Sequence, residues 1–144
     1  MYKRILFPTD GSDISAKALN HALAMTRLCG AELFVLSVKE PFPFSAISEM
    51  QPTPPQEFYD QQERVAAARV KAAVDSATAA GLNCTGHTVE ASYAWEAIVD
   101  HANTQECDLI VMASHGRRGM SALLLGSETQ KVLTHGTVPV LVVR

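Results

Sequence analysis

The feature that most constrains this chain is a strict alternation of short apolar runs with segments of helical periodicity. Between the first two runs, Ile14, Ala18, Ala22 and Met25 recur at a spacing that buries one face of a helix, and Gly30 follows where a C-cap glycine belongs. The apolar runs predict strands over 2–7, 31–38, 83–90, 108–113 and 138–143. The segments between them predict helices over 14–29, 59–81, 92–105 and 127–135.

This order predicts an α/β fold with three layers, α/β/α, around a five-stranded and mostly parallel sheet. Five prolines between residues 40 and 56 exclude a helix or a central strand there and predict a surface loop. The 144 residues, which show no internal repeat, are interpreted as one domain, 1–144. In open parallel sheets, ligands bind at the carboxyl ends of the strands, so the residues that follow each strand are the candidates for function.

Composition and local chemistry argue against several classes of function. Each apolar run is about as long as one strand and falls far short of the roughly 20 residues that cross a bilayer, so no membrane partner is expected. The net charge of −3 offers no attraction to nucleic acid. Pro8 and Asp10 interrupt the first run before it could act as an export signal, and a cytoplasmic location is expected. The three scattered cysteines are expected to be buried, reduced thiols.

Polar residues follow the first strand, where a ligand site would lie. Asp10 comes directly after Pro8 and Thr9, and an acidic side chain at this place can accept hydrogen bonds from ribose hydroxyls. The alternative is that Asp10, Ser12 or Asp13 only caps the next helix, which these residue types do well. Taken alone, the segment favours the capping role.

A second candidate site follows the fourth strand. The chain there runs through Met112-Ala113-Ser114-His115-Gly116-Arg117 and reaches a Gly-Ser-Glu helix start at 126–128. Glycines let backbone N–H groups approach a phosphate, and a helix N-terminus adds unpaired donors and a positive dipole. The spacing matches neither a P-loop nor a Gly-x-Gly-x-x-Gly dinucleotide loop. The segment is a candidate anion site, and a glycine-rich turn without a ligand is the alternative.

Three separated motifs together resemble the universal stress protein family. They are Pro8-Thr9-Asp10-Gly11-Ser12, His115-Gly116-Arg117-Arg118-Gly119, and Leu-Leu-Gly126-Ser127 with a Val-Pro-Val-Leu-Val-Val ending. The resemblance covers the whole chain and implies a Rossmann-like fold, a role in the stress response, binding of ATP or another adenine nucleotide, and a homodimer. The terminal strand, Val138 to Val143, is expected to form the dimer contact, because an unpaired apolar edge is an aggregation hazard.

Family members that bind ATP carry Gly-x-x-Gly, nine residues, then Gly-Ser/Thr. This chain has Ala113 in place of the first glycine, and a Cβ there would crowd the ribose, so weaker or more selective binding is expected. By resemblance, Pro8, Thr9 and Val38 line the adenine, Asp10 holds the ribose, and Met112, Ala113, Gly116, Gly126, Ser127 and Glu128 surround ribose and phosphates. The predicted binding set also includes His115, Arg117 and Gly119.

Two of these side chains have open roles. A carboxylate such as Glu128 repels a triphosphate unless Mg²⁺ lies between them, so ATP with Mg²⁺ is one interpretation; a favourable charge at a helix N-terminus is the other. Arg117 either reaches phosphate oxygens or is solvated.

Three functions follow from these observations. The first is a regulatory module that responds to an adenine nucleotide, the second is a slow ATPase, and the third is an interaction dimer that binds no nucleotide, which Ala113 favours. His115 has no catalytic partner at a suggestive spacing, and neither a nucleophile triad nor a carboxylate pair is apparent. No catalytic residue is therefore predicted.

Overall fold

The computed structural model describes residues 1–41, 55–117 and 125–144, and its helices and strands alternate as the sequence predicts. In chain order they are β1 (Arg4–Pro8), α1 (Asp13–Cys29), β2 (Glu32–Lys39), α2 (Gln56–Ala79), β3 (Cys84–Glu90), α3 (Ala94–Thr104), β4 (Leu109–Ala113), α4 (Ser127–His135) and β5 (Val140–Val143). Most of the predicted loop 40–56, together with Gly119, lies outside the described residues.

The five strands form one sheet in the order β3-β2-β1-β4-β5, and every neighbouring pair is parallel. The chain moves outward from β1 to β3, returns to β4 beside β1, and then moves outward to β5 in the opposite direction. The order therefore reverses between β1 and β4. In open α/β sheets, this reversal opens a crevice at the carboxyl ends of the two central strands.

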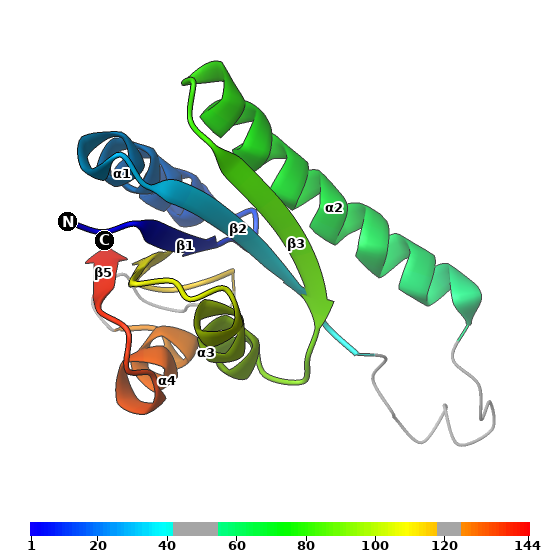
Figure 1. Cartoon of the computed structure of the whole chain (residues 1–144). Helices are drawn as coiled ribbons and strands as arrows, with labels where there is room; N and C mark the ends of the chain where they lie inside the picture. Colours follow the sequence, from blue (N-terminus) through cyan, green and yellow to red (C-terminus); the bar gives the residue numbers. More distant parts are fainter. Residues whose placement is uncertain (42–54, 118–124) are drawn as a thin grey trace.

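Helices cover both faces of the sheet, which confirms the three-layer α/β fold. Figure 1 shows α1 and α2 on one side and α3 and α4 on the other. Side chains that alternate along each strand enter two separate cores: Ile5, Phe7 and Val111 pack under α1 and α2, whereas Leu6 and Ile110 pack under α3 and α4. This alternation follows from the period of two along a strand.

Local signals set the ends of α1. The Ser12 hydroxyl accepts a hydrogen bond from the Ser15 backbone N–H at 3.2 Å and caps the first turn. At the other end Gly30 adopts φ 62°, the left-handed conformation that favours glycine, and its N–H bonds to carbonyls of the last turn. The predicted C-cap is thereby confirmed, and Ser12 fulfils the capping role that the sequence left open.

The helical spacing of Ala94, Ile98 and Ala102 predicts that these residues form the inward face of α3, and the structure differs in one place. Ile98 and Ala102 are buried as expected, but Ala97 is the third buried residue of this helix and Ala94 is only half-buried. Ala94 is the first residue of the helix, whereas Ala97 lies one turn further along it.

Small residues bring α2 close to the edge strand β3. Ala66, Ala73 and Ala77 are buried on the helix, and Gly86 of β3 faces Val70 and Val74 of the same helix. A Cβ placed on Gly86 would lie 2.2 Å from Cγ1 of Val70, so no side chain fits at this position unless the Val70 side chain shifts. Among the described residues, no helix is both long enough and apolar enough to cross a membrane.

Candidate functional site

The loops that follow β1 and β4 meet at the reversal in strand order, and Asp10 joins them. Its Oδ2 accepts a hydrogen bond from the Arg117 backbone N–H at 2.7 Å, although 107 positions separate the two residues. Its Oδ1 accepts the Ser12 N–H at 3.0 Å. The two motifs that the sequence singled out are therefore parts of one site.

The start of the β1–α1 loop is fixed by its own hydrogen bonds. Pro8 ends β1 beside Leu36, and the Thr9 N–H donates to the Leu36 carbonyl at 2.8 Å. The Thr9 hydroxyl lies 2.8 Å from the Ser15 hydroxyl and accepts the Gly11 N–H at 3.2 Å. The half-buried Val38, near the end of β2, packs against the core under α3 and α4.

Two glycines allow the second loop to close on the first. A Cβ on Gly116 would lie 2.8 Å from Oδ2 of Asp10, and a Cβ on Gly126 would lie 2.8 Å from Cα of His115. The Gly126 N–H donates to the Ser114 carbonyl at 2.7 Å, which ties the two ends of this segment together. A side chain at residue 126 would thus meet the backbone, and one at residue 116 would displace the Asp10 carboxylate.

The residues around Ala113, which replaces the first glycine of the ATP-binding motif, are well packed. Met112 and Ser114 are buried, and Ala113 packs against the core under α1 and α2. The Ala113 carbonyl accepts the Thr129 hydroxyl at 3.0 Å, which anchors the first turn of α4 to the end of β4. The exposed Ser127 begins this helix, next to Gly126.

Glu128 has a structural partner that the sequence did not reveal. Its Oε2 accepts the Trp95 backbone N–H at 2.7 Å, in the first turn of α3. The N-cap residue of α3, Tyr93, provides no side-chain cap, so Glu128 supplies the missing acceptor and a favourable negative charge. The carboxylate therefore links α4 to α3.

The remaining predicted residues divide between the described and undescribed parts of the loop. Nδ1 of the half-buried His115 lies 3.2 Å from the Ser114 hydroxyl, and Arg117 is exposed.

Within the described ranges, no three His, Cys, Asp or Glu side chains gather as a metal site. Burial raises the pKa of the Cys84 and Cys107 thiols to about 11, so both are protonated at neutral pH.

Arg69 of α2 also reaches this site and was missed from the sequence. Its Cγ and Nε lie 3.1 Å from the position that a Cβ on Gly11 would occupy. Burial lowers the pKa of Arg69, the nearby charge of Arg117 lowers it further, and Asp10 and Glu40 act in the opposite direction. An arginine on one flank of a long helix looks solvated in the sequence, and only the tertiary fold brings it over the β1–α1 loop.

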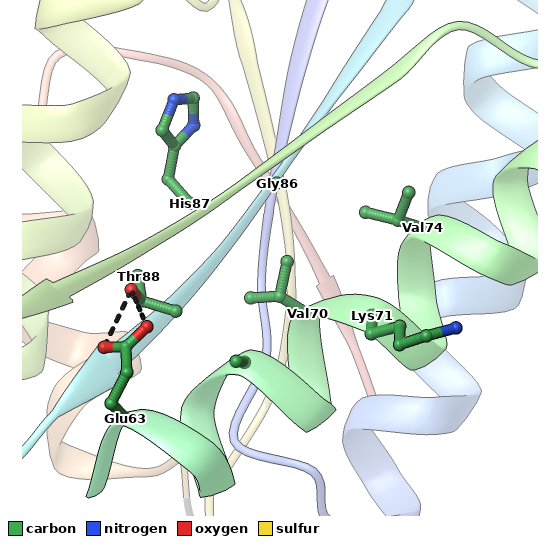
Figure 2. Close-up of a pocket in the computed structure, with 8 residues that line it drawn as sticks. Glu63, Val70, Lys71, Val74, Gly86, His87 and Thr88 are labelled. Atoms are coloured by element: carbon green, nitrogen blue, oxygen red, sulfur yellow. Dashed lines mark hydrogen bonds between the residues drawn. The ribbon is translucent and has the colours of Figure 1, made fainter. Parts of the chain in front are cut away.

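A separate hollow of about 400 Å³ lies between α2 and β3. Figure 2 shows Val70 and Gly86 in its wall, and shows Glu63 bonded to Thr88, whose hydroxyl lies 3.2 Å from Oε1. The ring of His87 points to the other side of β3. This hollow includes none of the predicted site residues.

The fold and the joined loops define a class of protein: an open α/β sheet with a candidate anion site where its strand order reverses. The sequence model of the universal stress protein family matches residues 1–144, and the chain belongs to this family. Universal stress protein MJ0531 of Methanocaldococcus jannaschii is 32% identical over 145 residues, which span all of this chain and 83% of that protein.

Solved structures are similar over almost the whole chain. The hypothetical protein MJ0577 has a TM-score of 0.84 and 30% identity, covering 99% of this chain and 96% of its own. A universal stress protein solved in complex with cAMP has a TM-score of 0.74 and 25% identity, covering 99% of this chain and 97% of its own.

Proposed function

We propose that this protein binds ATP or a related adenine nucleotide at the carboxyl ends of β1 and β4. The observation that carries the proposal is the Asp10 bridge between the two loops, flanked by two glycines that leave no room for a Cβ. A relative that shares the fold, at 25% identity, was solved in complex with cAMP, which has the adenosine core of the proposed ligand.

Each part of the nucleotide has a proposed partner. Adenine would lie against Pro8, Thr9 and Val38, and the Asp10 carboxylate would accept hydrogen bonds from the ribose. Backbone N–H groups near Gly116, and those at the start of α4, would bind the phosphates, because a helix N-terminus combines free donors with a positive dipole. The exposed Ser127 hydroxyl adjoins these donors.

We do not expect protein side chains to surround a Mg²⁺ ion at this site. The carboxylates of Asp10 and Glu128 already accept backbone N–H bonds, and no metal cluster of three ligating side chains exists among the described residues. A Mg²⁺ that accompanies ATP would therefore be held mainly by phosphate oxygens and water, as this ion commonly is.

The site suggests a regulatory rather than a chemical role. A nucleotide that touches both loops binds better to conformations in which they are joined and so shifts the population of surfaces offered to other proteins. Within the described residues, the carboxylates nearest the proposed phosphates are engaged in structural hydrogen bonds. We therefore propose a nucleotide-responsive module of the stress response.

We further propose a homodimer formed through β5. This strand lies at one edge of the sheet, and Val140, Leu141 and Val142 are only half-buried in the protomer. Antiparallel pairing with a second copy would cover these apolar residues and give the backbone N–H and C=O groups of the edge strand hydrogen-bond partners.

The direct test is calorimetric titration of nucleotide-stripped protein with ATP and Mg²⁺, with AMP and adenosine as comparisons. We expect micromolar binding of ATP that weakens as phosphates are removed. No heat and no thermal stabilisation with millimolar ATP would refute nucleotide binding and favour the nucleotide-free interaction dimer.

A further inference from the structure

Arg69 holds an unusual position for a surface arginine. It lies near the middle of α2 with its side chain partly buried and its aliphatic stem and Nε against Gly11, directly beside Asp10. Within the described parts of the chain, its guanidinium makes no hydrogen bond or ion pair. Its nitrogens are not among the fully buried polar atoms without a partner in these parts of the chain, so the guanidinium stays accessible to water and to a ligand.

The charges around Arg69 are mixed: burial and Arg117 disfavour its charged form, whereas Asp10 and Glu40 favour it. Asp10 is the nearby carboxylate on the facing loop, and its two oxygens accept the N–H groups of Ser12 and Arg117. Arg117 places a second positive charge near that of Arg69, and the two charges repel each other. Two arginines and two carboxylates, Asp10 and Glu40, therefore lie near this loop, and a phosphate would give both arginines a further partner.

We infer that Arg69 contacts the phosphates of the bound nucleotide and, with Arg117, makes the site select phosphorylated adenine nucleotides over adenosine. The inference rests on the proposed function and extends it to a residue outside both loops. A guanidinium presents a planar fork of donors that matches two phosphate oxygens, so its contribution grows with the charge of the ligand and is absent for adenosine.

The test compares Arg69→Gln with Arg64→Gln, which makes the same chemical change on the same helix at an exposed residue bonded to Gln61. Titration calorimetry with ATP, AMP and adenosine gives the affinities. We expect Arg69→Gln to weaken ATP by about tenfold and adenosine by less than about twofold, because only the phosphate contact is lost. Arg64→Gln should change neither.

Two further measurements separate ligand contact from a structural role. Because Arg69 makes no hydrogen bond or ion pair with another described residue, whereas Arg64 bonds to Gln61, the ligand-free Arg69→Gln protein should melt no lower than Arg64→Gln. The affinity of Arg69→Gln for ATP should also fall less steeply with added salt than that of the unmodified protein. Arg69→Lys, which keeps the charge and loses the fork, should give an intermediate ATP affinity.

The outcomes are distinguishable. If the unmodified protein binds ATP and Arg69→Gln binds it equally well, the inference is wrong while the proposed function stands. Equal weakening of ATP and adenosine, or a lower melting temperature of ligand-free Arg69→Gln, would assign Arg69 a structural role and also overturn the inference. If the unmodified protein binds no adenine nucleotide, the proposed function and the inference fail together.

Discussion

At the residue scale, Asp10 combines two structural tasks, of which the sequence indicated only the local one. One carboxylate oxygen bonds to Ser12 at the start of α1, as a local cap would, and the other bonds to Arg117 across the crevice. The side chain therefore stabilises the local turn and also fixes the distance between the two loops. The proposed ribose contact would be a third use of the same group.

The variant Asp10→Ala is predicted to weaken ATP, AMP and adenosine to a similar degree. All three ligands share the ribose, and a lost hydrogen bond to a charged group costs about 1.5–3 kcal/mol, which is about tenfold or more in affinity. Calorimetric titrations check this result. Asp13→Ala, a change of the same type in the first turn of α1, serves as the control; a loss confined to ATP in Asp10→Ala would contradict the proposed pose.

Residues in local motifs could be predicted from the sequence, whereas contacts between distant elements could not. Gly116, Gly126 and Asp10 were predicted as site residues because they belong to local motifs at strand ends, and the structure brings them together. Arg69 and the Glu128–Trp95 hydrogen bond could not be predicted, because they depend on how α2 and α3 are placed. No local pattern carries that information.

At the element scale, the contact between α2 and β3 depends on one missing side chain. Gly86→Ala would place a Cβ within 2.2 Å of Cγ1 of Val70 and should lower the free energy of unfolding by about 1–3 kcal/mol. In the double variant Gly86→Ala/Val70→Ala, the space vacated by valine accommodates the new methyl group. The double variant should therefore lose less free energy of unfolding than the two single variants lose in total. Urea unfolding measures all four proteins, and additive losses would contradict this account.

A second element contact, between α3 and β3, should make stability depend on pH. The rings of His101 and His87 lie 5.0 Å apart, and Nε2 of His101 is buried without a hydrogen-bond partner. Burial, and then the charge of His87, lowers the pKa of His101 from 6.5. Glu90, Glu96 and Asp100 line the adjoining hollow with His101 and provide the opposite charges nearby.

The sign of the effect follows from proton binding. With a lowered pKa in the folded state, His101 binds fewer protons when folded than when unfolded, so stability is complete above pH 6.5 and declines as the pH falls below that value. Urea midpoints at several pH values between 7.5 and 5 test this, and His101→Gln should show a shallower decline. His21→Gln, at an exposed position of α1, should retain the full decline.

The elements themselves were largely predictable. The bounds of α4 match the sequence prediction, because Gly126 precedes the helix and Gly136 follows it. The strand β5 begins at Val140 rather than at residue 138, since Pro139 contributes only its carbonyl, which accepts the Ile110 N–H at 2.9 Å. Edge residues lack a second neighbour, so their pairing cannot be judged from hydrophobicity alone.

At the scale of the whole molecule, the direction of the backbone groups in β5 determines how two copies could join. The carbonyls of Pro139 and Val143 accept N–H groups from Ile110 and Ser114, so odd-numbered residues of β5 bond to β4. The N–H and C=O groups of Val140 and Val142 therefore point away from the sheet, because these groups alternate along a strand.

The variant Val142→Pro is predicted to remove the proposed dimer and leave the protomer folded. It deletes an outward donor without touching the bonds to β4, and proline is tolerated on edge strands. Light scattering coupled to size-exclusion chromatography gives the mass, and circular dichroism reports the fold. Val142→Ala, which keeps the donor, should remain dimeric. A monomeric unmodified protein, or a dimeric Val142→Pro, would exclude this interface.

The arrangement of the whole sheet was only partly accessible from the sequence. Strict alternation of strands and helices predicts parallel pairing, and the structure confirms it. The order β3-β2-β1-β4-β5 has no local signal, because every strand is similarly apolar and each crossover helix allows a neighbour on either side. The place where the order reverses, where we propose the nucleotide site, becomes visible only in the assembled sheet.

The bridge between Asp10 and Arg117 also determines when the entropic cost of binding arises. Backbone donors from two loops hold this carboxylate, so its rotamer is fixed as the chain folds, before any ligand arrives. A ribose hydroxyl would meet a preorganised acceptor and would share or replace a bond that already exists. In the proposed complex, nucleotide affinity and folding stability would be coupled through one side chain, so changes that loosen either loop should lower both.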